Sequence, residues 1–87
     1  MVSQKTKIIN ETGLHMKPAH TFVSTMSKYK SNVDLVVGDK RINGKSIMNV
    51  LGACLECGTE VLVECNGEDE VEMLETASNL LGTQFTD

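Results

Sequence analysis

The segment TGLHMKPAH, residues 12–20, holds both histidines and the only proline of the 87-residue chain. An imidazole is a competent nucleophile near neutral pH, and Gly13 gives the backbone freedom to turn the ring of His15. Pro18 suits the first position of a helix, but the three residues before it offer no side chain that normally caps one. Free N–H groups and the helix dipole there favour a bound or covalent phosphate. The segment therefore predicts either a phosphoryl acceptor at His15, with Lys17 as a charge beside it, or a histidine with no chemical role in an exposed loop.

The elements that position this segment are predicted to form an α+β domain that spans residues 1–87. Residues 32–37 and 40–43 bracket a Gly-Asp turn as a hairpin, and residues 59–65 alternate as a strand. A weaker fourth strand is predicted over residues 5–10. Apolar residues at helical spacing predict a first helix that begins at Pro18, with the stripe Ala19, Phe22, Val23 and Met26.

The last helix is the clearest of the predicted elements. Acidic residues occupy its first turn, where the helix dipole favours negative charge: Glu68, Asp69, Glu70 and Glu72. An apolar stripe follows, and Gly82 is expected to end the helix. The stripe consists of Val71, Leu74, Ala77, Ser78 and Leu81.

The segment SIMNVLGACLEC, residues 46–57, predicts a short helix capped by Ser46. Its apolar side chains cover an arc of roughly 160°, which is wider than one core-facing stripe needs. Two interpretations follow. In the first, every apolar residue is core, and in the second Met48 and a neighbour form an exposed docking patch. The pattern alone favours the first.

The three cysteines suggest reduced thiols, since their number is odd and no export signal precedes them. Cys54 and Cys57 form a C-x-x-C pair that could belong to a thiol or metal module. The pair is expected to close a helix, where the dipole disfavours a thiolate, and zinc would need a second pair of ligands that the chain lacks. We therefore expect no metal site and small apolar fillers instead, with Cys65 in the core.

Composition excludes several classes of partner. The formal net charge is −4, without a basic run, which argues against direct contact with nucleic acid or an anionic membrane. No apolar stretch approaches the ~20 residues that span a bilayer, so no membrane insertion is expected. The polar start MVSQKTK lacks the apolar core of a signal peptide, which predicts a cytoplasmic protein. We expect no cofactor.

Three motifs, at residues 13–19 (GLHMKPA), 45–48 (KSIM) and 67–70 (GEDE), resemble HPr, the histidine-containing phosphocarrier family of the bacterial sugar phosphotransferase system. The resemblance covers nearly the whole chain. It implies an open-faced β-sandwich, a four-stranded antiparallel sheet covered on one face by three helices. It also implies that His15 accepts a phosphoryl group from phosphorylated enzyme I and passes it to an enzyme IIA unit. Ser46 matches the regulatory serine, which an ATP-dependent HPr kinase phosphorylates in many bacteria.

The resemblance also implies docking residues, which reverses the preference drawn from the pattern of residues 46–57. The residues after the serine contact partner proteins in the family, so Ile47, Met48 and Leu51 become candidates for partner docking. The family fills the positions of Met16 and His20 with small or apolar residues, so this chain departs from the pattern where partners dock.

The third departure is Lys17, which stands where the family has arginine. Arginine grips a phosphate through two parallel bonds, whereas lysine is a hydrated point charge. With Met16 and His20, this departure leaves an alternative open: an HPr-like protein that binds a transcription regulator or an enzyme when Ser46 is phosphorylated, without carrying phosphoryl groups to sugar transporters.

Overall fold

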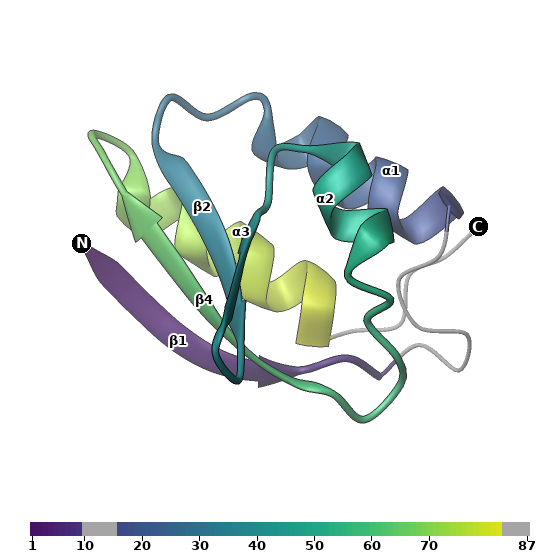
Figure 1. The fold of residues 1–87 in the computed structure, drawn as a ribbon. Helices are drawn as coiled ribbons and strands as arrows, with labels where there is room; N and C mark the ends of the chain where they lie inside the picture. Colours follow the sequence, from purple (N-terminus) through teal and green to yellow (C-terminus); the bar gives the residue numbers. More distant parts are fainter. Residues whose placement is uncertain (10–15, 83–87) are drawn as a thin grey trace.

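The fold, seen in a computed structural model that describes residues 1–9 and 16–82, combines a four-stranded sheet with three helices (Figure 1). Its elements in chain order are β1 (Val2–Lys7), α1 (Met16–Met26), β2 (Asn32–Val37), β3 (Lys40–Asn43), α2 (Ile47–Gly52), β4 (Glu60–Asn66) and α3 (Glu70–Gly82). The predicted open-faced α+β sandwich is confirmed. No helix within the described ranges has the length and apolar character that a membrane crossing requires.

The sheet is antiparallel, with strand order β1-β4-β2-β3. The β2–β3 hairpin lies where the sequence predicts it, and Gly38 at its turn has a φ of 62°, which glycine adopts without strain. The predicted first strand, residues 5–10, was placed too late, because the strand begins at Val2 and ends at Lys7. The polar residues at its start form a strand because they pair with β4, from Val2 opposite Cys65 to Lys7 opposite Glu60. Asn10 lies outside the described residues.

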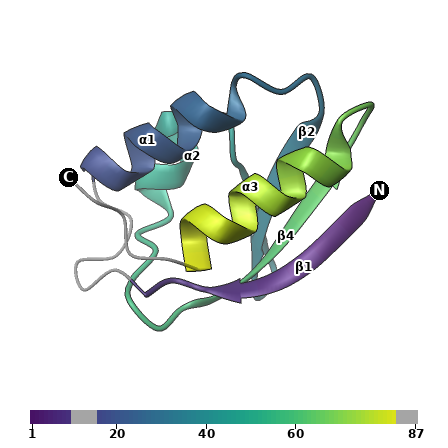
Figure 2. The same ribbon diagram turned by 180° about the vertical axis from the view of Figure 1, so that it is seen from behind.

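All three helices pack on one face of the sheet, and the core lies between the two layers (Figures 1 and 2). Alternate residues of β4 face this core, which confirms the predicted inward side of the strand: Val61, Val63 and Cys65. In α3 one predicted core residue is wrong, because Val71 is 61% exposed and Met73 is buried instead. Val71 lies about 120° around the helix from the buried Ala77, at the edge of the stripe.

Helix α1 begins at Met16, two residues before the predicted start at Pro18. Proline is compatible with any position of the first turn, because the first N–H groups of a helix have no partner within it. Lys17 is therefore a residue of the first turn. The predicted stripe is confirmed for Ala19, Phe22 and Met26, and Val23 is partly buried.

A hydrogen-bonded link joins the segment after α1 to the start of α3. The carboxylate of Asp69 accepts hydrogen bonds from the backbone N–H of Lys30 at 3.0 Å and of Ser31 at 2.9 Å, and from the hydroxyl of Ser31. The same hydroxyl oxygen accepts the N–H of Asp69 at 3.0 Å. These bonds lower the pKa of Asp69 to about 2, and the hydrogen bond from the Ser31 hydroxyl has the largest effect. The ionised carboxylate therefore stabilises the fold.

The variant Asp69→Ala is expected to lower the Tm at pH 7 by about 5 to 10 °C, because a charge-assisted link between two elements is lost. The native pKa lies below the unfolded value of 3.8, so this contribution is complete above about pH 4 and disappears as the pH falls toward 2. The Tm difference between variant and wild type should shrink over that interval. Thermal unfolding followed by circular dichroism measures both effects. Asp39→Ala, at the exposed hairpin turn, is the matched control and should leave the Tm nearly unchanged.

Candidate functional site

The first turn of α1 presents the residues that follow the proposed acceptor. Met16 is 65% exposed, and Lys17 and His20 are exposed as well, so all three are open to a partner. The turn contains no acidic residue, and within the described ranges no side chain accepts a hydrogen bond from its backbone N–H groups. A helix end of this kind favours an anion beside it. His15 itself lies outside the described residues.

Ser46 caps α2, as the sequence predicts. Its side-chain oxygen accepts the N–H of Asn49 at 3.3 Å, and its carbonyl accepts the N–H of Val50 at 3.0 Å. The residues before Ser46 are themselves fixed by hydrogen bonds. The Nζ of Lys45 donates to the carbonyl of Tyr29 at 2.7 Å, and the side chain of Asn43 accepts the N–H of Lys45. The half-buried serine is thus positioned by both neighbouring segments.

The apolar residues of α2 and of the segment that follows it divide between the core and the surface. Val50 and Leu55 are buried, whereas Met48 is 79% exposed, so the interpretation in which the whole segment is core is wrong. Ile47 and Leu51 are partly buried and pack against the core cluster. An exposed methionine is adaptable in contact with different partners. The geometry therefore leaves Met48 available for docking.

Both views place α1 beside α2, which brings the two sets of candidate residues onto neighbouring helices (Figures 1 and 2). We call these residues the α1–α2 surface: Met16, Lys17, His20, Ile47, Met48 and Leu51. Two stretches about 30 residues apart in the sequence thus contribute to one region of the molecule. An apolar surface with a cation at its end suits a protein partner that brings or takes a phosphoryl group.

The cysteines occupy two different environments. Cys65 is buried in the core, as predicted, and burial raises the pKa of its thiol to about 11. Cys54 and Cys57 are both exposed beyond the end of α2, so the prediction that they fill apolar space is wrong. Cys54 has a φ of 52°, a conformation uncommon for non-glycine residues. Among the residues that the structure describes, no group of three or more His, Cys, Asp or Glu side chains could hold a metal ion.

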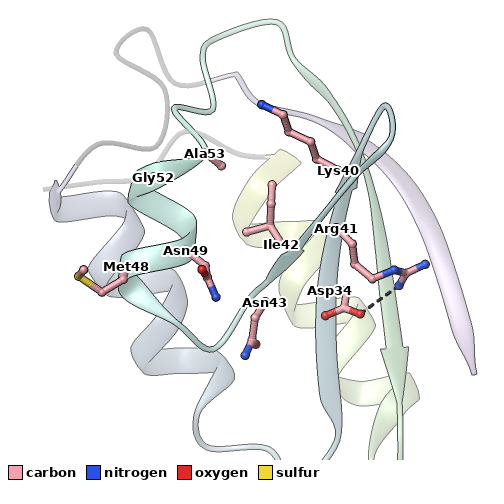
Figure 3. A pocket seen from close by; sticks show the side chains of 9 residues that line it. All are labelled: Asp34, Lys40, Arg41, Ile42, Asn43, Met48, Asn49, Gly52 and Ala53. Atoms are coloured by element: carbon pink, nitrogen blue, oxygen red, sulfur yellow. Dashed lines mark hydrogen bonds and ion pairs between the residues drawn. The ribbon is translucent and has the colours of Figure 1, made fainter.

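A hollow of about 670 Å³ lies between β3 and α2, and no feature of the sequence predicts it (Figure 3). Strand residues line one side and helix residues the other: Asp34, Lys40, Arg41, Ile42, Asn43, Met48, Asn49, Gly52 and Ala53. Arg41 donates to the carboxylates of Asp34 and Glu64 and is thereby held along the strand. No motif marks such a hollow, because its two sides come from elements that only the fold brings together.

The fold is that of a small α+β protein with three helices on one face of a four-stranded antiparallel sheet, and known proteins share it. The family profile described as "PTS HPr component phosphorylation site" matches residues 2–83. The phosphocarrier protein HPr of Neisseria meningitidis is 36% identical over 85 residues, which are 98% of this chain and 96% of that protein. The HPr-like protein Crh of Bacillus subtilis is 41% identical over 75 residues, 86% of this chain and 88% of that one.

Solved structures show the same fold. HPr from Thermoanaerobacter tengcongensis superimposes with a TM-score of 0.89 at 34% sequence identity, over 93% of this chain and 91% of that one. The chain belongs to the HPr family of the phosphotransferase system. This family comprises phosphocarriers and HPr-like proteins such as Crh, so the chain has a phosphocarrier or HPr-like role.

Proposed function

We propose that the chain is a phosphocarrier of the sugar phosphotransferase system, with His15 as the phosphoryl acceptor. The observation that carries the proposal is the family match across the segment GLHMKPA, residues 13–19, together with a first helical turn that has an exposed cation and no acidic residue. Phosphorylated enzyme I is the donor, and an enzyme IIA unit of a sugar transporter is the recipient. Docking takes place on the α1–α2 surface.

The chemistry is a phosphoryl transfer between two proteins. A ring nitrogen of His15 attacks phosphorus, and an N–P bond forms as the bond from phosphorus to its donor atom on enzyme I breaks. The ring proton is released, and the negative oxygens of the transferred group meet Lys17 and the N–H groups at the start of α1. Transfer to enzyme IIA reverses these roles. The chain thus carries a phosphoryl group and forms a phosphohistidine intermediate.

The test is incubation of the purified protein with phosphoenolpyruvate and enzyme I. Formation of one phosphoryl group that is labile in acid and stable in mild alkali is the expected result, followed by its transfer to an added enzyme IIA. If no enzyme I from the same cell labels the protein, the carrier function is wrong.

Lys17→Arg is expected to speed transfer less than tenfold, since arginine can bind two phosphoryl oxygens in parallel where lysine offers one point charge. Most of the stabilisation remains with backbone donors and with the partner's own site, so the gain stays on the order of 1 kcal/mol or less. Rates of phosphoryl transfer from enzyme I, measured by rapid quench, report the change. Lys28→Arg, an exposed lysine that follows α1, is the control and should have no effect.

A second candidate function rests on the match to the HPr-like protein Crh and on the departures at Met16, Lys17 and His20. In this function phosphorylation of Ser46 by an HPr kinase switches binding to a transcription regulator or an enzyme. In that case the rate of phosphoryl transfer from enzyme I is limited by docking of the two proteins, and not by the contact between Lys17 and the phosphoryl group. Lys17→Arg alone would have no effect in that case, while Met16→Ala combined with His20→Ala would raise the rate.

A further inference from the structure

The outer edge of β3 carries backbone groups that no other strand uses. The N–H of Gly44 donates to the carbonyl of Val33 at 2.9 Å, which fixes the alternation of the ladder between β2 and β3. Hydrogen-bonded pairs alternate along an antiparallel ladder, so Ile42 pairs with Leu35 through backbone hydrogen bonds and Lys40 pairs with Val37 in the same way. The N–H and C=O of Arg41 and the N–H of Asn43 therefore point away from the sheet. The carbonyl of Asn43 is taken by the N–H of Ser46 at 3.2 Å, which ends the open edge on that side.

This edge faces the hollow between β3 and α2 (Figure 3). The hollow is a broad depression of about 670 Å³ that is open to solvent, so an extended chain can reach it from the side. Its helix side is lined by the small residues Gly52 and Ala53. A Cβ atom added at Gly52 would meet no atom within 4 Å, so this side of the hollow has unfilled space. An edge with free backbone groups beside unfilled space is the arrangement to which an extended chain adds as a further strand.

The groups in the hollow favour an acidic occupant. Lys40 has no ion-pair partner among the described residues, whereas Arg41 is already bound by Asp34 and Glu64. The outward backbone groups of β3 supply two N–H donors and one C=O acceptor. A second copy of the chain would bring the Lys40 and Arg41 of its own β3 against this edge, and like charges across a strand pair are destabilising.

We propose that the β3 edge and the adjoining hollow bind an extended, acidic segment of a partner protein, which adds as a fifth strand beside β3. Its backbone pairs with Arg41 and Asn43, one acidic side chain meets Lys40, and an apolar side chain lies against Gly52 and Ala53. This site is separate from the α1–α2 surface, although Met48 borders both. The proposal does not depend on phosphoryl transfer through His15.

The test uses an acetylated and amidated octapeptide of alternating glutamate and valine, titrated into uniformly labelled protein and followed by amide NMR. Saturable binding is expected, with the largest shifts at Arg41 and Asn43 and slowed hydrogen exchange at those two amides. The same peptide with N-methyl groups on alternate amides should not bind, because its backbone donors are lost. Binding that survives N-methylation, or no binding at millimolar peptide, overturns the proposal. So does concentration-dependent dimerisation through β3 in the absence of peptide, since the occupant would then be a second copy.

Matched variants locate the site. Arg41→Pro removes an outward N–H that the ladder does not use, and Arg41→Ala keeps it while losing the same side chain. The proline variant should bind the peptide about fivefold to tenfold more weakly than the alanine variant. Gly52→Phe fills the hollow without removing any group of β3 and should abolish binding. Equal affinities for the peptide in wild type and in every variant that folds would overturn the proposal. Because two of the variants change β3 and one changes α2, loss of a single variant leaves the comparison possible.

Discussion

The variant His15→Ala takes up no acid-labile phosphoryl group from phosphoenolpyruvate and enzyme I, while the wild-type protein becomes labelled. This is the expected result because we propose the histidine of the segment GLHMKPA, residues 13–19, as the acceptor. Alanine removes the nucleophile, and no other residue beside the first turn of α1 replaces an imidazole. Intact-protein mass spectrometry under mildly alkaline conditions measures the label, and the loss should be complete within detection.

His20→Ala is the control for this result. His20 is exposed on the second turn of α1, so it lies on the side of the helix, whereas the free N–H groups of the first turn face along the axis beyond the helix start. Its removal should weaken labelling and not abolish it. Label that persists in His15→Ala, or that maps to His20, would contradict the assignment of the acceptor.

Ser46→Asp is expected to slow phosphorylation of His15 by enzyme I on the order of tenfold or more, because it places a charge on the α1–α2 surface beside Met48 and Leu51. Aspartate is itself a good N-cap, so α2 should remain folded. The Tm should change little for the same reason. Stopped-time labelling and thermal unfolding measure the two quantities separately.

Ser46→Ala separates the charge from the cap. It removes the oxygen that accepts the N–H of Asn49, which costs about 1 kcal/mol of stability, but it adds no charge. Transfer from enzyme I should stay near the wild-type rate. An unchanged rate in Ser46→Asp would eliminate the regulatory role of Ser46, and equal slowing in both variants would assign the effect to the cap.

The sequence predicts the fold well where local signals and tertiary contacts agree. The hairpin over residues 32–43 is confirmed because glycine at its turn and alternating side chains point to the same pairing. The start of β1 could not be predicted, since its polar residues form a strand only through pairing with β4. Val71 fits the helical spacing of a core residue, but the face that meets the sheet is centred on Met73 and Ala77. The spacing of apolar residues shows how wide the apolar face of a helix is, but it does not show which part of that face is turned toward the sheet.

The candidate site is predicted in part. The cap at Ser46 follows from residue type and position, and the structure confirms it. The exposure of Met48 depends on how α2 packs, so the pattern alone favoured the core and only the resemblance suggested docking. The hollow beside β3 could not be predicted from the sequence, because it depends on how far apart the fold places β3 and α2. The function of His15 remains a prediction, since that residue lies outside the described ranges.

The link from Asp69 to Lys30 and Ser31 lies beyond the C-terminal end of α1, whereas Met16 and Lys17 are at its N-terminal end. An eleven-residue helix separates them by about 16 Å. Changes more than about 10 Å apart without shared partners are usually additive in their effect on stability. Residues at the N-terminal end of α1 can therefore be exchanged during evolution without weakening the link between the segment after α1 and the start of α3. If partners dock at Met16, Lys17 and His20 as we propose, substitutions there change the choice of partner while the folding stability is preserved.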